Sequence, residues 1–229
     1  MKPTPIYDLF NFRDLGGHRM KNGGTTKCGA IARSNVLLKA AEADIAKLKE
    51  LGFTTIVDLR TEAELEQYPH QLRKHPDFTY IHAKCDNWWR DPFYGAEESA
   101  MYYMMLTFLH DNVRGVLTAI ADAQTGVVFN CHAGKDRTGI TAALCLLIAG
   151  AEDRDIIDDY AKTYTAYWGD MPADELVGKK KLIPVPENME MFLAMFRARY
   201  GTVEQYCRII GLPEEKMLAI RRKLTSCDK

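Results

Sequence analysis

Residues 126–151 read GVVFNCHAGKDRTGITAALCLLIAGA and are the most informative segment of the chain. It opens with a short apolar run rich in valine, which predicts a buried strand over residues 126–130. The small and apolar residues at 138–149 predict a helix directly after it. The loop between them therefore closes onto a helix N-terminus. Backbone N–H groups and the positive end of the helix dipole make such a place suited to binding an anion.

Cys131 opens this loop, and Arg137 ends it where the chain enters the helix. The local field favours the thiolate form of a cysteine in this position. The planar guanidinium of an arginine can hold two oxygens of a tetrahedral anion. The two residues therefore predict a nucleophile aimed at phosphorus and a cradle for a transferring phosphoryl group. The rest of the predicted substrate-binding cradle is His132, Ala133, Gly134, Lys135 and Asp136.

This loop does not match a nucleotide-binding P-loop. Gly134 and Lys135 are followed by Asp136, where that motif needs Ser or Thr, and Phe129 occupies the place of its first glycine. The alternative to a nucleophile at position 131 is a purely structural cysteine, buried at a strand-to-helix turn and unreactive. None of the other five cysteines has an arginine six residues later, and Thr138 follows the arginine here, so we favour the anion site.

On both sides of this segment the chain alternates predicted strands and helices, and towards its C-terminus it is predicted to be helical. Strands are predicted at 28–33, 53–59 and 78–83, and helical segments at 41–51 and 97–123. Later helices are predicted to begin at Asp153, Pro186, Thr202 and Pro213. We expect an α/β fold with a central, mostly parallel sheet flanked by helices and a helix-rich C-terminal half. Residues 1–229 are expected to form one domain, with 151–200 as a candidate helical lid or insertion.

Composition excludes several classes of protein. The 229 residues carry 30 Lys and Arg against 31 Asp and Glu, whereas nucleic-acid binders have a basic excess, so we expect no nucleic-acid partner. No apolar run approaches the roughly 20 residues of a transmembrane helix, and the N-terminus lacks the apolar core of a secretory signal. The six cysteines are widely spaced, so we expect no disulfide framework. The expectation is a cytoplasmic protein; the oligomeric state stays open.

No metal or other cofactor is expected either. His70, His75, His82 and Cys85 lie close together in the sequence, but their spacing matches no metal-binding motif.

Residues 131–138 resemble the signature loop of the cysteine-dependent phosphatases. The opening NFRDLGG at 11–17, the Asp58-Leu59-Arg60 stretch and the C-terminal residues 200–224 are similar to a microbial family of protein-tyrosine phosphatases. The resemblance spans most of the chain. It implies the phosphatase α/β fold, a phosphocysteine intermediate and no metal. It also implies a phosphorylated protein as substrate, with activity on phosphotyrosine that can extend to phosphoserine, phosphothreonine and phosphoinositides.

Asn130 departs from the wider superfamily, which usually has histidine directly before the catalytic cysteine; here the histidine follows, as His132. Asparagine can hydrogen-bond the loop backbone but carries no charge. The Cys131 thiolate is therefore expected to depend more on the loop amides and on Arg137.

A leaving alcohol needs a proton, which a carboxylic acid on a loop can supply. In the superfamily this acid follows the strand before the signature strand, which favours Asp86 in the aromatic-rich loop after residues 78–83. Asp136 is the second candidate and Asp91 the third. For each of them the alternative is a solvated carboxylate or a helix cap.

Other residues have supporting roles in this interpretation. Thr138 is expected to donate a hydrogen bond from its hydroxyl to the departing thiolate; the alternative is that it only starts the helix. Lys135 is expected to contact a second phosphate of the substrate; the alternative is that it is solvated. Two ion pairs, Asp58 with Arg60 and Arg13 with Asp14, are expected to hold the turn at residues 11–17. Asp58 and Arg60 could alternatively contact a ligand at the carboxyl edge of the sheet.

Two further segments are expected to have structural roles and no part in the chemistry. The basic run at 179–181 is expected to be a solvated face. The Met and Phe stripe at 189–196 is expected to pack in the core, with a substrate-covering lid as the alternative.

Two other function classes stay open at this point. A non-catalytic phosphate-binding module would keep the cradle without turnover, and only Asn130 favours it. A rhodanese-like sulfurtransferase also carries a cysteine on a strand-to-helix loop, but Arg137, Thr138 and the 11–17 motif argue against it.

Overall fold

The computed structural model describes residues 11–86, 98–170 and 183–225. Within them, five strands form one sheet in the order β1-β2-β5-β3-β4. The strands are β1 (Arg13–Asp14), β2 (Ile31–Ser34), β3 (Phe53–Asp58), β4 (Thr79–His82) and β5 (Gly126–Asn130). The short edge strand β1 is antiparallel to β2, and every other pairing is parallel. The predicted α/β fold with a mostly parallel sheet is confirmed.

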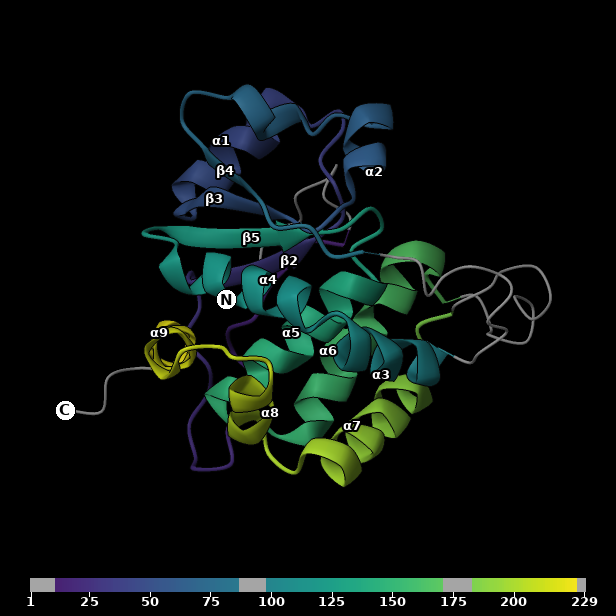
Figure 1. Ribbon diagram of the computed structural model, residues 1–229. Coiled ribbons are helices and arrows are strands. Elements are labelled where there is room, and N and C mark those ends of the chain that lie inside the picture. Colours follow the sequence, from purple (N-terminus) through teal and green to yellow (C-terminus); the bar gives the residue numbers. More distant parts are fainter. Residues whose placement is uncertain (1–10, 87–97, 171–182, 226–229) are drawn as a thin grey trace.

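Both faces of the sheet are covered. Alternate residues of a strand point to opposite faces, so Val128 joins one buried cluster, while Val127 and Phe129 join the other. On one side lie α1 (Glu42–Glu50) and α2 (Glu62–Gln67), and on the other lie the helices that follow β4 (Figure 1). A 3₁₀ turn, η1 (Gln71–Lys74), which the sequence did not predict, precedes β4.

Helices dominate the chain after β4, as predicted. They are α3 (Glu98–Phe108), α4 (His110–Asp122), α5 (Asp136–Ala149), α6 (Asp153–Trp168), α7 (Pro186–Tyr200), α8 (Val203–Ile209) and α9 (Glu214–Leu224). Capping boxes begin α2 at Thr61 and α8 at Thr202, and Pro186 occupies the first turn of α7. The predicted helical segment at 97–123 is two helices, because Leu109 leaves the helical region with φ −113° and ψ 41°.

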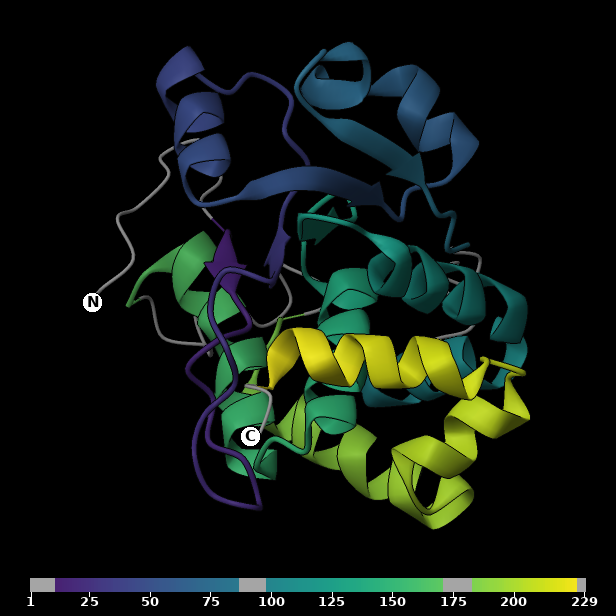
Figure 2. The same cartoon turned by 90° about the vertical axis from the view of Figure 1, so that its left-hand side faces the viewer.

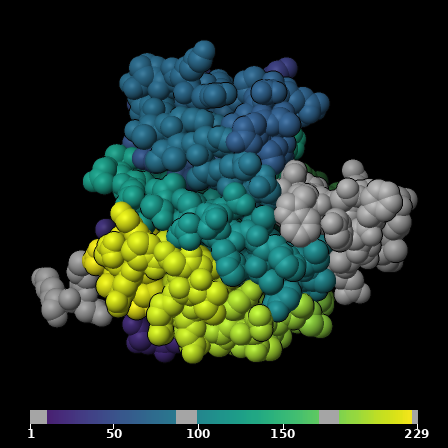
Figure 3. All heavy atoms as spheres, in the orientation of Figure 1, coloured from purple at the N-terminus to yellow at the C-terminus, as the bar shows by residue number. Residues whose placement is uncertain are grey.

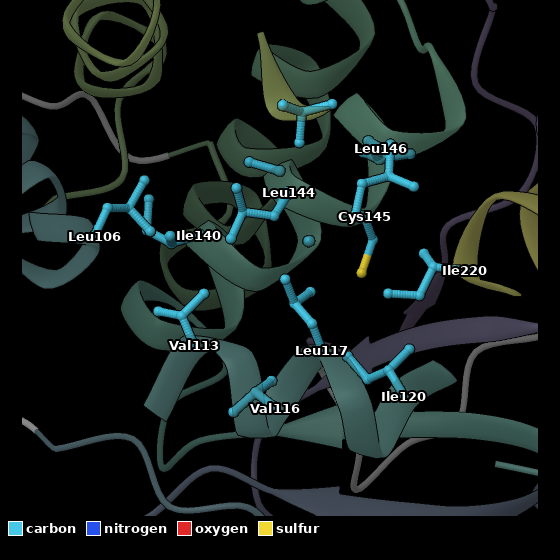
Figure 4. Close-up of a cluster of buried hydrophobic side chains, with 14 of the residues drawn as sticks. Leu106, Val113, Val116, Leu117, Ile120, Ile140, Leu144, Cys145, Leu146 and Ile220 are labelled. Carbon is cyan, nitrogen blue, oxygen red and sulfur yellow. The ribbon is translucent and has the colours of Figure 1, made fainter. Parts of the chain in front are cut away.

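The larger core is built around α5, in which all but one of the residues are buried. Figure 4 shows side chains of α3, α4 and α9 gathered around this helix; those labelled are Leu106, Val113, Val116, Leu117, Ile120, Ile140, Leu144, Cys145, Leu146 and Ile220. From the stripe at 189–196, Met189, Phe192 and Phe196 are buried in the same cluster, whereas Met191 is exposed. Core packing of this stripe is therefore confirmed for the buried residues.

The first described residues lie beside the last helices. Figure 2 shows the N-terminal segment running along α6 and reaching α9. The Lys27 N–H donates to the Leu224 carbonyl at 2.7 Å, and Arg19 pairs with Asp155 at 2.6 Å. In the space-filling view the blue part of the chain lies above and the yellow C-terminal helices lie below, with some purple N-terminal residues beside them (Figure 3). Among the described residues, no helix is both long and apolar enough to span a bilayer.

Candidate active site

The loop between β5 and α5 lies at the carboxyl edge of the parallel strands, where open α/β sheets bind ligands. Gly134 turns it with φ +66°, and a Cβ at this position would lie 2.3 Å from the Ser34 carbonyl oxygen. Only glycine therefore fits this turn against the end of β2. The loop is packed against the sheet and is not a free surface segment, since Cys131 is only 3% exposed.

The loop carbonyls are bonded to the surrounding scaffold. The His132 carbonyl accepts the Val36 N–H at 3.0 Å. The Ala133 carbonyl accepts the Tyr167 hydroxyl at 2.6 Å, and the Gly134 carbonyl accepts the Arg33 guanidinium at 2.8 Å. The side-chain amide of Asn11 donates to both of these last two carbonyls, at 3.1 and 3.0 Å. In a trans peptide the N–H points opposite to the C=O. The N–H groups of Ala133, Gly134 and Lys135 therefore point away from the scaffold, as an anion cradle requires.

Cys131 and Thr138 are joined across the loop. The Cys131 N–H donates to Thr138 Oγ1 at 2.8 Å, and Thr138 is fully buried at the start of α5. This bond places the hydroxyl at the base of the proposed nucleophile. Burial raises the pKa of Cys85 and of Cys207 to about 12, so both remain thiols at neutral pH.

Arg137 is held by a carboxylate that the sequence did not assign to the site. Its Nη1 and Nη2 each donate to a Glu64 oxygen at 2.7 Å, and its Nη1 also lies 3.3 Å from the carbonyls of Leu59 and Cys85. The Nε–H is buried without a hydrogen-bond partner among the described residues. The bidentate pair fixes the plane of the guanidinium and leaves this donor for an oxyanion.

The pairing shapes the charge of both groups. Burial would lower the pKa of Arg137, but its bonds to Glu64 hold that pKa well above its usual value. Burial would likewise raise the pKa of Glu64, yet the Arg137 bonds and charge lower it to about 2. Both groups are therefore charged at neutral pH. In the sequence Glu64 stands three residues after Thr61, which is the spacing of a capping box, and no local signal links it to an arginine 73 residues away.

The two leading candidates for the general acid lie in different surroundings. Asp86 is partly exposed and lies 3.3 Å from Lys84, directly after the residue whose carbonyl contacts Arg137. Asp136 is 3% exposed and accepts a 2.8 Å hydrogen bond from Tyr102. Asp91, the third candidate, lies outside the described residues.

Lys135 and His132 lie against neighbouring side chains. The Lys135 amine is 3.8 Å from the Asp136 carboxylate, and the residue is only 7% exposed, so the expected solvated alternative is wrong. The His132 ring contacts Tyr68 edge to face, with 5.2 Å between ring centroids. Burial first, and then the nearby Cys131 and Asp136, raise the pKa of Tyr167 well above its usual value. Aromatic side chains therefore flank the loop at two points.

Asn130 takes part in the backbone contacts expected of it. Its side-chain Nδ2 donates to the Cys131 carbonyl at 3.2 Å, and its amide also hydrogen-bonds His70. His70 is buried and had no assigned role in the sequence interpretation beyond a rejected metal motif. Among the described residues no group of His, Cys, Asp and Glu could hold a metal ion.

The structure corrects two expected ion-pair arrangements. Arg13 pairs with Asp159 of α6 at 2.7 Å and not with Asp14, whose carboxylate accepts the N–H groups of Gly16 and Gly29. The reason is that α6 brings a fully buried carboxylate to the edge strand, which no local sequence pattern could show.

Asp58 and Arg60 do pair, at 2.8 Å. Outside the pair, however, the Arg60 side chain donates to the Tyr68 carbonyl and the Asp58 carboxylate accepts from the Tyr80 hydroxyl. Among the described residues the pair therefore braces residues 58–80 and not the N-terminal turn.

Comparison with known proteins agrees with this geometry. The model of the tyrosine phosphatase family matches residues 4–226. A tyrosine-protein phosphatase of Nostoc commune is 28% identical over 225 residues, covering 85% of this chain and 74% of that protein. A Cupriavidus necator protein named for the same activity is 29% identical over 167 residues, covering 68% of this chain and 60% of its own length.

Among solved structures, TpbA of P. aeruginosa is similar at a TM-score of 0.41 and 11% identity, over 80% of this chain and 86% of that one. A likeness this distant adds nothing to the match of the family model, which covers nearly the whole sequence. The chain belongs to the tyrosine phosphatase family and is a hydrolase of the cysteine-dependent phosphatase class.

Proposed function

We propose that this protein hydrolyses phosphotyrosine in proteins through a phosphocysteine intermediate on Cys131. The observation that carries the proposal is the outward bonding of the carbonyls of residues 132–134 to the scaffold, which leaves the loop N–H groups for a phosphoryl oxygen. Preorganised donors of this kind stabilise charge that develops in a transition state without reorganising at the moment of reaction.

In the first step the Cys131 sulfur attacks phosphorus while the phosphorus–oxygen bond to the tyrosine breaks. The loop amides and Arg137 bind the equatorial oxygens, and a carboxylic acid protonates the leaving phenolate. In the second step water attacks phosphorus and gives a proton to the carboxylate left by the first step, while the sulfur–phosphorus bond breaks, giving inorganic phosphate and the original acid. The Thr138 hydroxyl, placed by its bond to the Cys131 N–H, supports the departing thiolate.

For the acid we propose Asp86. It is partly exposed and directly follows Cys85, whose carbonyl contacts Arg137, and this supports a place for it at the edge of the cradle. Asp136 is the second candidate, because it lies in the loop itself, directly before Arg137. The Tyr102 bond and the Lys135 contact occupy Asp136, which is why we place it second.

The neighbourhood of the loop supports an aryl phosphate as the preferred substrate. Tyr68 supplies the aromatic surface, because its ring packs against His132 of the loop and is 40% exposed. A phosphoinositide with a second phosphate would need a cation turned toward it, whereas Lys135 is buried beside Asp136. We therefore place phosphotyrosine ahead of phosphoserine, phosphothreonine and phosphoinositides.

The test compares wild type with Cys131→Ser on para-nitrophenyl phosphate, a phosphotyrosine peptide, a phosphoserine peptide and a phosphoinositide. We expect turnover to vanish in the variant while inorganic phosphate still binds, because serine keeps the cradle but forms an alkoxide far less readily than cysteine forms a thiolate. Retention of a tenth of the wild-type kcat would contradict the nucleophile. Faster turnover of the phosphoinositide than of the phosphotyrosine peptide would contradict the substrate class.

A further inference from the structure

Asn11, the first residue that the structure describes, reaches the phosphate-binding loop with its side chain. Asn11 is 1% exposed, and its Nδ2 donates to the Ala133 carbonyl at 3.1 Å and to the Gly134 carbonyl at 3.0 Å. These two carbonyls lie more than 120 residues away in the chain. The motif at 11–17 therefore contributes directly to the shape of the loop, beyond forming the turn expected from its sequence.

The orientation of the Asn11 amide is set by its other contacts. Its Oδ1 accepts a 2.6 Å hydrogen bond from Arg13 Nη1, and its backbone N–H donates to Asn35 Oδ1 at 3.3 Å. A flipped amide would place its oxygen against the two loop carbonyls and its NH₂ against the guanidinium, both repulsive. Arg13 thus fixes which end of the amide faces the loop.

Arg13 is itself held by α6. Its Nε donates to Asp159 Oδ1 at 2.7 Å, and its Nη2 donates to the Asp159 carbonyl and the Thr163 hydroxyl. Burial would raise the pKa of Asp159, but the charges of Arg13 and Arg33 hold it well below its usual range. The anchor of this network therefore stays ionised across the neutral range.

A second arm starts from the same carboxylate and ends on the same loop. Arg33 Nη1 binds Asp159 Oδ2 at 2.7 Å, and its Nη2 donates to the Gly134 carbonyl at 2.8 Å. The Gly134 carbonyl therefore receives two donors, one from each arm. Donation to a carbonyl fixes the peptide plane, and in hydrogen-bond chains it also polarises the N–H on the opposite side.

We infer that Asn11, oriented by Arg13, is a positioning residue of the phosphate-binding loop: through the Ala133 and Gly134 carbonyls it holds the N–H groups of Gly134 and Lys135 toward the transferring phosphoryl group. The inference rests on the proposed function. It does not place Asn11 in contact with the substrate. Its consequence is that loss of the two donors should weaken binding of a transition-state-like anion more than it weakens substrate binding.

The test replaces Asn11 by aspartate, which keeps the shape and the acceptor for Arg13 but removes both N–H donors. Orthovanadate serves as the probe of the transition-state geometry. We expect its affinity to fall by about 10- to 100-fold, since losing one direct oxyanion donor costs roughly 10²–10³ in kcat and Asn11 acts through the backbone. The kcat for para-nitrophenyl phosphate should fall by a similar factor, with KM changing by less than about threefold. Alkylation of Cys131 by iodoacetamide should need a higher pH.

Thr26→Val is the matched control. Thr26 is a buried residue of the same N-terminal region, and its hydroxyl donates to the Leu15 carbonyl and accepts from the His18 N–H, at 2.7 and 3.0 Å. The control should lower the melting temperature but leave orthovanadate affinity within about twofold of wild type. Asn11→Ala, which buries no new charge, is the second test variant.

A folded Asn11 variant that binds orthovanadate like wild type would overturn the inference, and so would an equal loss of affinity in Thr26→Val. Failure of both Asn11 variants to fold would also overturn it, in favour of a purely structural role. A wild-type protein without turnover would refute the proposed function itself. A working wild type with indifferent Asn11 variants would refute only the role of Asn11.

Discussion

Glu64 serves a helix and a cationic side chain at the same time. One of its oxygens accepts from the Thr61 N–H at 2.9 Å in the capping box of α2, and both oxygens bind Arg137. The start of α2 and the angle of the proposed phosphate-binding arginine are therefore set by one carboxylate. A change at this residue should reach the chemistry without touching the substrate.

We expect Glu64→Gln to lower kcat/KM by about 10- to 100-fold, because small misplacements of a catalytic group can cost about 100-fold. Glutamine keeps one acceptor but loses the charge and the bidentate geometry. Glu66→Gln, an exposed change on the same helix, is the control and should have no effect. Steady-state kinetics with para-nitrophenyl phosphate measure both, and equal activity of the two variants would contradict the role.

The Glu64–Arg137 pair should also affect the stability of the folded protein at low pH. Because the pKa of Glu64 falls to about 2 in the folded protein, the stabilisation is complete above the ordinary value of about 4.3 and is lost as the pH drops toward 2. Urea unfolding should therefore show nearly the same change in unfolding free energy between pH 7 and 5 in Glu64→Gln and wild type, and the two should diverge only below that range.

The general acid can be identified by its dependence on the leaving group. If Asp86 donates the proton, Asp86→Asn should slow hydrolysis of phosphotyrosine by about 10²–10⁴-fold, the usual contribution of positioned proton transfer. It should affect para-nitrophenyl phosphate far less, because that phenol leaves readily as an anion. Asp136→Asn is the matched comparison, measured with both substrates. If only Asp136→Asn shows the leaving-group dependence, the proton comes from within the loop and our assignment of Asp86 is wrong.

At the scale of elements, the turn between β5 and α5 depends on the absence of a side chain at Gly134. Gly134→Ala should abolish activity, since its Cβ would meet the Ser34 carbonyl oxygen and force the loop away from β2. Gly52→Ala is the control, because Gly52 also has a positive φ, +82°, but a Cβ there meets nothing within 4 Å. It should cost about 1–2 kcal/mol of unfolding free energy and leave kcat/KM unchanged.

Kinetics and urea unfolding of the two glycine variants separate backbone strain from loss of loop shape. An active Gly134→Ala protein would show that the loop tolerates displacement from β2.

The elements themselves could be predicted from sequence where their signals are local. The strand at 126–130, the capping boxes at Thr61 and Thr202 and the start of α7 at Pro186 depend only on residues near them in the chain. The break at Leu109 could not be predicted, because the apolar spacing continues through it. Packing decides such a break, and packing is not local.

The candidate site also contains both residues that the local sequence identifies and residues that it does not. Cys131, Arg137 and Thr138 lie within eight residues of sequence and could be identified together. Glu64 and Asn11 could not be assigned their contacts, because each touches the loop from a distant part of the chain. For the same reason the sequence could not show that Arg13 pairs with Asp159, a buried carboxylate on α6, and not with Asp14.

At the scale of the whole molecule, we propose that the chain forms a single phosphatase domain. The support is that α6 and α7, within the segment considered as a lid or insertion, contribute Tyr160, Phe192 and Phe196 to the same buried cluster as α5. Asp159 of α6 also binds both β1 and β2 through arginines. Residues 171–182 of that segment lie outside the described residues.

Stability of the whole molecule should depend on pH through His70. Burial lowers the pKa of His70 to about 4, with the charge of Arg60 adding to the effect and the charge of Asp58 and the Asn130 bond opposing it. The unfolded chain binds this proton near pH 6.5. Between pH 6.5 and 4 the unfolded state therefore holds more protons, so stability falls as the pH falls, by about 3 kcal/mol over the whole window.

His70→Asn isolates this contribution. The His70 Nδ1 accepts the Leu72 N–H at 3.1 Å, and an asparagine oxygen can accept the same bond without titrating. His75→Asn is the matched control, since His75 accepts the Asp77 N–H at 3.2 Å in the same way but is partly exposed. Urea unfolding at several pH values should give a flatter dependence between pH 6.5 and 4 in His70→Asn and an unchanged one in the control. If the pH dependence of the unfolding free energy in His70→Asn equals that of the wild type, groups other than His70 cause the destabilisation in acid.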